Sequence, residues 1–207
     1  MRKKLFFITI PLQGKNQLGK TRYRKEDKGE LYSRETSFPG IAMLENCVLG
    51  NEDIRIVTVR TAVENGETEK NYEQFKSELS ELADEMGREL TISGEILIPH
   101  SENRHKQVEF FKELCAQCEP DCDVYMDITF GTKVTSVCMF TLLTYAEKML
   151  RDDICGIYYG KYDHYNNTPG ELYNVRSMYD IAALIRSAEH LPQDNINDLL
   201  ELLWRGE

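Results

Sequence analysis

The chain alternates between short apolar runs and longer segments whose apolar residues recur at helical spacing, and this alternation constrains its fold more than any other feature. Apolar runs rich in β-branched and aromatic residues predict strands that are buried on both faces. Strands and helices in regular succession favour a parallel sheet with helices on both faces and right-handed crossovers. The predicted strands span residues 5–10, 54–59, 90–98, 124–128 and 154–159.

Helices are predicted in the intervals between these strands. The clearest spans 69–86, where apolar residues lie three and four positions apart and Gly87 follows, a residue that can end a helix in the left-handed conformation. Ser101 can cap another helix through its side-chain oxygen. Further helices are expected over 38–49 and over 132–150.

Two regions depart from the alternation. Residues 20–36 are polar and predict a small protruding hairpin that turns near Lys28-Gly29. After Gly160 the pattern predicts a short edge strand at 172–175, followed by two helices.

The whole pattern predicts an α/β fold with a helical appendage. Residues 1–175 are expected to form a Rossmann-like parallel sheet of five or more strands with helices on both faces, and residues 176–207 a C-terminal helical segment. The last helix carries Ile196, Leu199 and Leu203 along one face, which is more apolar surface than a free tail should expose. We therefore expect it to dock on this domain, on a second subunit or on a partner such as an effector domain.

Composition and apolar run length bear on where the protein resides. The chain is 41% hydrophobic and 29% charged, as expected of a soluble globular protein. The apolar run at 5–10 stops at Pro11 and Gln13 without a small-residue cleavage site, so it does not predict a signal peptide. No run approaches the roughly 18 apolar residues that a membrane span needs. We expect a cytoplasmic protein that is neither inserted into a membrane nor exported.

The net charge of −10 argues against a long nucleic acid as partner, because such binding depends on neutralising many phosphates. The charge is unevenly distributed, however. Residues 1–28 contain nine Lys or Arg and two acidic residues, which leaves a net charge of −17 on the rest. A compact anion can therefore be attracted to one region of an acidic protein.

Six cysteines in a chain without an export signal predict free thiols rather than a disulfide framework. Cys115, Cys118 and Cys122 have a spacing that a zinc site can use, but no fourth ligand is evident nearby. We interpret them as a cysteine-rich helix end and turn. Neither a metal nor a cofactor is predicted.

The most specific candidate site is the turn Asp127–Lys133, which follows the fourth predicted strand. Ligands of parallel α/β sheets bind outside the carboxyl ends of the strands, where the strand order reverses. Hydroxyl residues and a glycine at a strand-to-helix junction present backbone N–H groups at a helix N-terminus, which suits an anion. Lys133 opposes the helix dipole there, and contact with an anionic ligand explains this position better than helix stability does. A solvated lysine is the alternative. Asp127 is interpreted as structural rather than as a general base.

Three weaker candidates should lie at the same edge of the sheet. Pro11–Lys15 has a glycine beside amide and ammonium donors, but it lacks the glycine spacing of dinucleotide-binding and P-loop motifs. Arg60 and Thr61 follow the second strand and His100 the third, and each can face either a ligand or solvent.

In combination, three segments make the sequence similar to the CRISPR-associated Rossmann fold (CARF) family. The first is Asp127–Lys133 with the apolar helix after it, and the second is Gly156-Ile157-Tyr158-Tyr159-Gly160. The third is Ile96–Ser101 leading into Phe110–Leu114. The resemblance covers about residues 1–175. Phe130 stands where many members have a second glycine or a histidine.

The resemblance implies a homodimer that senses cyclic oligoadenylate of four or six AMP units (cA4 or cA6) in type III CRISPR antiviral signalling, with the ligand on the two-fold axis. Family members usually continue into an effector domain, so the chain can be a stand-alone sensor, a ring-opening nuclease or a sensory fragment. The ligand-contacting positions that it implies are Thr9, Pro11, Leu12, Gln13, Gly14, Thr129, Phe130, Gly131, Thr132 and Lys133.

Two enzymatic alternatives stay open. In the first, the same pocket opens the ring without metal: a ribose 2′-OH attacks the adjacent phosphate, and Lys133 or backbone amides stabilise the oxyanion. The sequence supplies no evident base for this reaction. In the second, the chain is an unrelated monomeric enzyme that acts on a nucleotide or a sugar phosphate, since fold does not determine function.

Overall fold

The computed structural model describes residues 2–12, 18–25, 29–62, 66–98, 103–162, 168–188 and 192–205. The chain divides into two compact units, residues 1–174 and residues 175–207, and each is described by itself. Three of the predicted site residues, Gln13, Gly14 and His100, lie outside the described residues.

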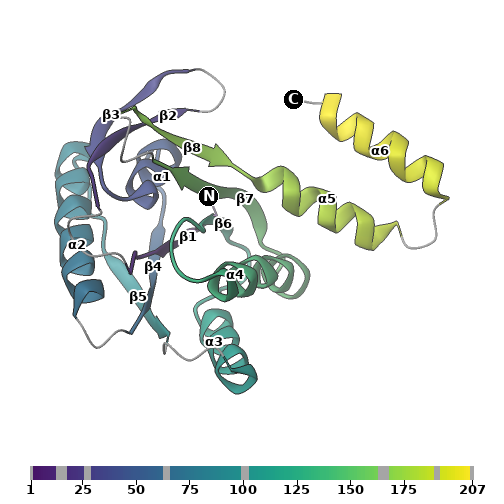
Figure 1. Ribbon diagram of the computed structural model, residues 1–207, viewed down its shortest axis with the longest axis horizontal. Coiled ribbons are helices and arrows are strands. Elements are labelled where there is room, and N and C mark those ends of the chain that lie inside the picture. The colour runs from purple at the N-terminus through teal and green to yellow at the C-terminus, as the bar shows by residue number, and fades with distance from the viewer. Residues whose placement is uncertain are drawn as a thin grey trace. The chain divides into compact units, whose positions relative to one another are not determined.

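The first unit is built on a sheet whose eight described strands have the order β3-β2-β8-β7-β6-β1-β4-β5 (Figure 1). Its parallel part has the spatial order β5-β4-β1-β6-β7, so the strand order reverses between β1 and β6. This confirms the predicted Rossmann-like sheet. The parallel strands are β1 (Lys4–Thr9), β4 (Ile54–Thr61), β5 (Ile92–Ile98), β6 (Asp123–Asp127) and β7 (Asp153–Lys161).

Three further strands extend the sheet beyond β7. Strand β8 (Gly170–Asn174) is antiparallel to β7 and parallel to β2 (Thr21–Lys25), which pairs in turn with β3 (Leu31–Thr36). The predicted hairpin therefore forms, but it joins the sheet instead of protruding. The strand predicted at 172–175 forms as β8, but its predicted position at the edge was wrong, because β2 pairs with the outer side of β8.

Helices cover both faces of this sheet. On β1, Phe6 and Ile8 belong to the apolar cluster formed with α1 (Pro39–Cys47) and α2 (Glu67–Met86). Leu5 and Phe7 are also fully buried and, because strand side chains alternate, face the opposite side. Figure 1 shows α3 (Arg104–Ala116) and α4 (Lys133–Tyr145) on that side. A π-helical turn, η2 (Ala146–Leu150), follows α4 directly.

Helix α1 approaches the carboxyl end of β7 so closely that the strand has no room for a side chain there. A Cβ atom added to Gly160 would lie 2.5 Å from Cβ of Pro39, the first residue of α1. Gly160 is thus the point at which the helix packs directly against strand backbone. This contact explains structurally why the segment 156–160 ends in a glycine, Gly160.

The second unit consists of α5 (Arg176–Ser187) and α6 (Gln193–Arg205), which confirms the predicted C-terminal helical segment. Within the described residues, no helix combines the length and the apolar character needed to cross a lipid bilayer.

Candidate functional site

The turns that follow β1 and β6 meet where the strand order reverses. The backbone N–H of Phe130 donates a hydrogen bond to Oγ1 of Thr9, with a distance of 3.0 Å between the two atoms. This contact brings the end of β1 and the predicted turn 129–133 together at the carboxyl edge of the sheet. Parallel α/β sheets bind ligands at this position.

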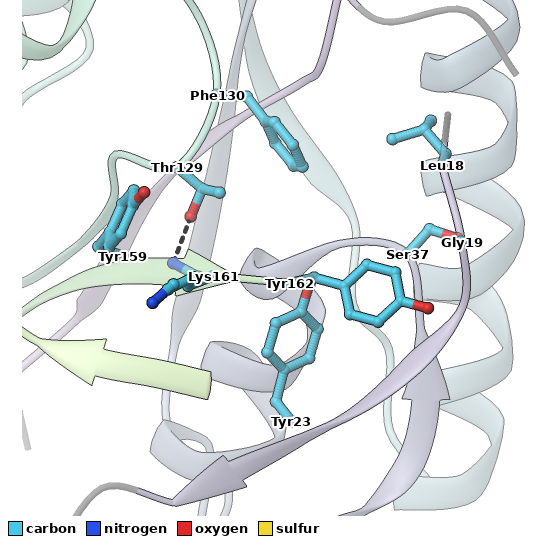
Figure 2. A pocket seen from close by; sticks show the side chains of 10 residues that line it. Leu18, Gly19, Tyr23, Ser37, Thr129, Phe130, Tyr159, Lys161 and Tyr162 are labelled. Carbon is cyan, nitrogen blue, oxygen red and sulfur yellow. Dashed lines mark hydrogen bonds between the residues drawn. The ribbon is translucent and has the colours of Figure 1, made fainter. Parts of the chain in front are cut away.

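A buried carboxylate organises this meeting point. Asp127 is fully buried, and its Oδ1 accepts hydrogen bonds from the backbone N–H and the hydroxyl of Thr129, while its Oδ2 lies 3.4 Å from Oγ1 of Thr9. The hydroxyls of Thr9 and Thr129 donate to this carboxylate, and each can also accept a hydrogen bond from a backbone N–H. Thr9 accepts from Phe130, and Thr129 accepts from Gly160 at 2.8 Å (Figure 2). Asp127 therefore ties together the ends of β1, β6 and β7.

Burial also changes the acidity of this carboxyl group. Removal from water disfavours the charged form and raises the pKa of Asp127 to about 6, although the hydrogen bonds from Thr129 and Thr9 act in the opposite direction. Its oxygens are occupied by groups of the protein, as expected of a structural residue.

Helix α4 begins at the predicted turn. Thr132 is its N-cap, and the Thr132 hydroxyl accepts a hydrogen bond from the N–H of Thr135 at 3.2 Å. Lys133 is the first helical residue, is exposed, and forms no ion pair with any residue that the structure describes. Its ammonium group is available to an anion at this end of the helix.

Gly131 precedes the cap with φ of +94°, which L-amino acids rarely adopt, and an added Cβ atom would lie 3.0 Å from Cγ2 of Thr135. We expect Gly131→Ala to lower the unfolding free energy by about 1–2 kcal/mol. Urea denaturation measures this effect. The matched control is Gly19→Ala, because Gly19 has no positive φ and meets only the side chain of Tyr162. An equal loss in the two variants would contradict the assignment of strain to Gly131.

An open pocket of about 210 Å³ lies beside this turn, at the carboxyl ends of β6 and β7. In the sheet, β7 and β8 lie between β6 and β2. Leu18 and Gly19, which come shortly before β2 in the sequence, border the pocket on the side opposite the end of β6. Figure 2 shows Thr129 and Lys161 on one side of the pocket and Leu18 on the other. The described residues that line it are Leu18, Gly19, Tyr23, Ser37, Thr129, Phe130, Tyr159, Gly160, Lys161 and Tyr162.

A second buried carboxylate supports the far wall of the pocket. Glu78 of α2 accepts hydrogen bonds from the hydroxyl of Thr36 and from the backbone N–H of Ser37, the latter at 3.2 Å. Gln74 donates to both Glu78 and the Ser37 hydroxyl at 3.0 Å. The end of β3 is thereby fixed to α2, and Ser37 is held at the pocket.

Other predicted site residues are engaged with the protein itself. The guanidinium of Arg60 pairs with Glu69 and Glu95 and lies 4.7 Å from the ring centroid of Tyr72. Thr61 is buried at 3% exposure. The structure therefore does not bring Arg60 or Thr61 to the pocket lining.

The described residues of the turn after β1, Pro11 and Leu12, are also held by the protein itself. The carbonyl of Pro11 accepts a hydrogen bond from Nδ2 of Asn71 at 2.9 Å, and Leu12 is half-buried. Neither residue is among those that line the pocket.

Sequence reasoning missed most of the pocket lining. Tyr23 lies on β2, and Tyr159, Lys161 and Tyr162 lie at and just after the end of β7. The available signal was the clustering of tyrosines and a lysine around Gly160, together with the tyrosines of the polar hairpin. Their convergence depends on β8 and β2 joining the sheet, which the spacing does not reveal.

Part of the charge excess at the amino terminus lies elsewhere. Lys3 pairs with Glu119 at 2.7 Å and Lys4 with Glu52 at 3.0 Å, at the opposite edge, where β1 begins. Among described residues near the turns, Lys20 lies 3.6 Å from the buried Glu78.

The cysteines are free thiols. Burial raises the pKa of Cys118 to about 12, and it also raises those of Cys115 and Cys122, which keeps the thiols protonated at neutral pH. In the part of the chain that the structure describes, no three His, Cys, Asp or Glu side chains are grouped as metal ligands.

No protein-family model matches this chain, and no curated protein sequence matches it significantly.

Proposed function

We propose that this protein binds cyclic oligoadenylate at the carboxyl edge of its sheet and acts as a sensor in type III CRISPR antiviral signalling, like the CARF domains that it resembles. The observation that carries the proposal is the pocket that lies beside the turn 129–133, at the carboxyl ends of β6 and β7. The turn itself begins at β6, next to the point where the strand order reverses. A nucleotide ligand needs both a surface for its base and donors for its phosphate. This edge offers aromatic rings, lysines and the N-terminus of α4 together.

Two lysines support phosphate binding here. Lys133 and Lys161 are both exposed, and within the described part of the chain neither forms an ion pair with a carboxylate. By contrast, Lys3 and Lys4 at the opposite edge are paired. Ammonium groups without a carboxylate partner can bind phosphate without first losing a salt bridge.

The size of the pocket supports a ligand shared between two copies of the chain. Its volume of about 210 Å³ is below the roughly 300–1,000 Å³ of sites that enclose drug-sized molecules. Most of a ring of four or six AMP units would therefore lie outside it. We propose that a second subunit, related by a two-fold axis, contacts the rest of the ring.

Isothermal titration with cyclic tetra-adenylate and cyclic hexa-adenylate tests the proposal. One of the two rings is expected to bind at micromolar concentration or below, with one ring per two chains. Lys133→Ala is expected to weaken binding about tenfold, because a charge-assisted hydrogen bond is lost. Lys112→Ala is the matched control, since Lys112 is exposed on α3, away from the pocket, and should leave the affinity unchanged.

Absence of binding to both rings would overturn the proposal, and so would equal losses in the Lys133→Ala and Lys112→Ala proteins. Chromatography of the ligand after incubation in EDTA adds a separate readout. A sensor returns the ring intact, and the described side chains that line the pocket include no carboxylate or imidazole to act as a base. Linear products would instead identify a metal-independent ring nuclease.

A further inference from the structure

Four aromatic rings from separate parts of the chain converge on the pocket. Tyr23 comes from β2, Phe130 from the turn after β6, and Tyr159 and Tyr162 from the end of β7. Tyr23 is only 3% exposed and belongs to the apolar core, so it forms a fixed inner wall. The other three rings retain exposure, and Tyr159 reaches 42%.

The arrangement of these rings leaves flat apolar surface directed at an open space. Figure 2 shows the ring of Phe130 on one side of the pocket and the rings of Tyr23 and Tyr162 on the opposite side. Aromatic faces of this kind stack with planar ligands, and every nucleobase presents such a face. Phosphate is better accommodated where the charges lie, beside Lys161 in the pocket lining and Lys133 at the start of α4.

The wall of the pocket also offers a directional polar group. The hydroxyl oxygen of Ser37 accepts a hydrogen bond from Gln74 at 3.0 Å, and Ser37 is 4% exposed. Among the described residues no group accepts a hydrogen bond from the Ser37 hydroxyl, so its proton can be donated to an acceptor in the pocket. Purine ring nitrogens are acceptors of this type.

We propose that this pocket is a nucleobase subsite in which one purine of a nucleotide ligand stacks between Phe130 and Tyr162, with the Ser37 hydroxyl donating to a ring nitrogen. The inference rests on the proposed function only in placing a nucleotide at this edge. It adds that the base, and not only the phosphate, determines which ligand binds. Phosphate contacts alone would not distinguish adenylate from uridylate.

The probe is 2-aminopurine riboside 5′-monophosphate, whose fluorescence is quenched when its base stacks on an aromatic ring. Titration of the full chain is expected to quench the probe, and AMP, but not UMP, is expected to compete. Tyr162→Leu should weaken binding of the probe about tenfold and remove most of the quenching at saturation. Tyr162→Phe should retain both, because it keeps the ring.

Two further variants separate stacking from other effects. Tyr145→Leu removes a half-buried tyrosine of α4 that does not line the pocket, and it should leave the titration unchanged. Lys133→Ala should shift the titration midpoint but leave the quenching at saturation intact. Thermal melts of all variants establish that each is folded under the conditions of the titration.

The outcomes are distinguishable from those of the proposed function. Quenching that depends on Tyr162, without binding of either cyclic oligoadenylate, would retain the nucleobase subsite and reject the sensor. If a cyclic oligoadenylate binds, and Tyr162→Leu changes neither its affinity nor the quenching of the probe, the subsite is rejected and the sensor is retained. Equal competition by AMP and UMP would also overturn the subsite.

Discussion

Between about pH 4 and pH 7, the unfolding free energy of the wild-type protein is expected to fall by about 2 kcal/mol relative to that of the Asp127→Asn protein. Burial raises the pKa of Asp127 from 3.8 to about 6, so in this range the folded state binds a proton that the unfolded chain has already lost. The stabilisation is complete below pH 3.8 and disappears as the pH rises through about 6. Asparagine does not titrate and removes this contribution.

Urea denaturation at closely spaced pH values measures the difference between the two proteins. Asp84→Asn is the matched control, because it removes a carboxyl group that is exposed on α2 instead of buried. Parallel curves for wild type and Asp127→Asn would show that the carboxyl group at the meeting point of the three strands does not titrate in this range, and the prediction would be wrong.

Gly160→Ala is expected to lower the unfolding free energy by about 1–3 kcal/mol, because the new methyl group would overlap the ring of Pro39. Relief would require α1 to move away from the sheet, and α1 is buried along most of its length, including Ile41 and Leu44. For a chain of this size, each kcal/mol corresponds to a shift of roughly 2–4 °C in Tm. Differential scanning calorimetry provides the measurement.

The control for this substitution is Gly50→Ala. Gly50 is exposed, and an added Cβ atom would meet nothing closer than the flexible side chain of Glu52 at 3.9 Å. Its Tm should change by no more than about 2 °C. A Gly160→Ala protein as stable as the Gly50→Ala protein would contradict the close packing of α1 against β7.

The parallel core of the fold was predictable because its signal is local. Strands such as 5–10 and 154–159 are continuous apolar runs, and Gly87 ends α2 with φ of +62°, as a glycine at that position predicts. The turn 129–133 was also predictable as the start of a helix at the carboxyl edge. Its hydroxyl, glycine and lysine residues are adjacent in sequence, so no long-range contact had to be inferred.

The tyrosine-lined pocket could not be predicted in the same way, because it depends on pairing between distant segments. Tyr23 reaches the pocket only because β2 pairs with β8, and in this register Tyr23 lies opposite Gly170. The sequence of the hairpin indicates two strands but not their partner. Arg60 shows the converse error: its position at a strand end suggested a ligand, but nearby carboxylates on α2 and β5 satisfy its charge.

The position of β2 and β3 in the sheet also determines when this part of the molecule can be completed. The hairpin is synthesised early, yet it is joined to the rest of the sheet only by the pairing of β2 with β8, whose residues emerge almost 150 positions later. Contacts between such distant segments form slowly, since a long loop must first close. A nascent chain that has reached β6 therefore has the central parallel strands and the α2 residues that bind the end of β3, but β2 still lacks its partner β8 in the sheet. The tyrosine-lined pocket, which also needs the end of β7, is among the last features to assemble.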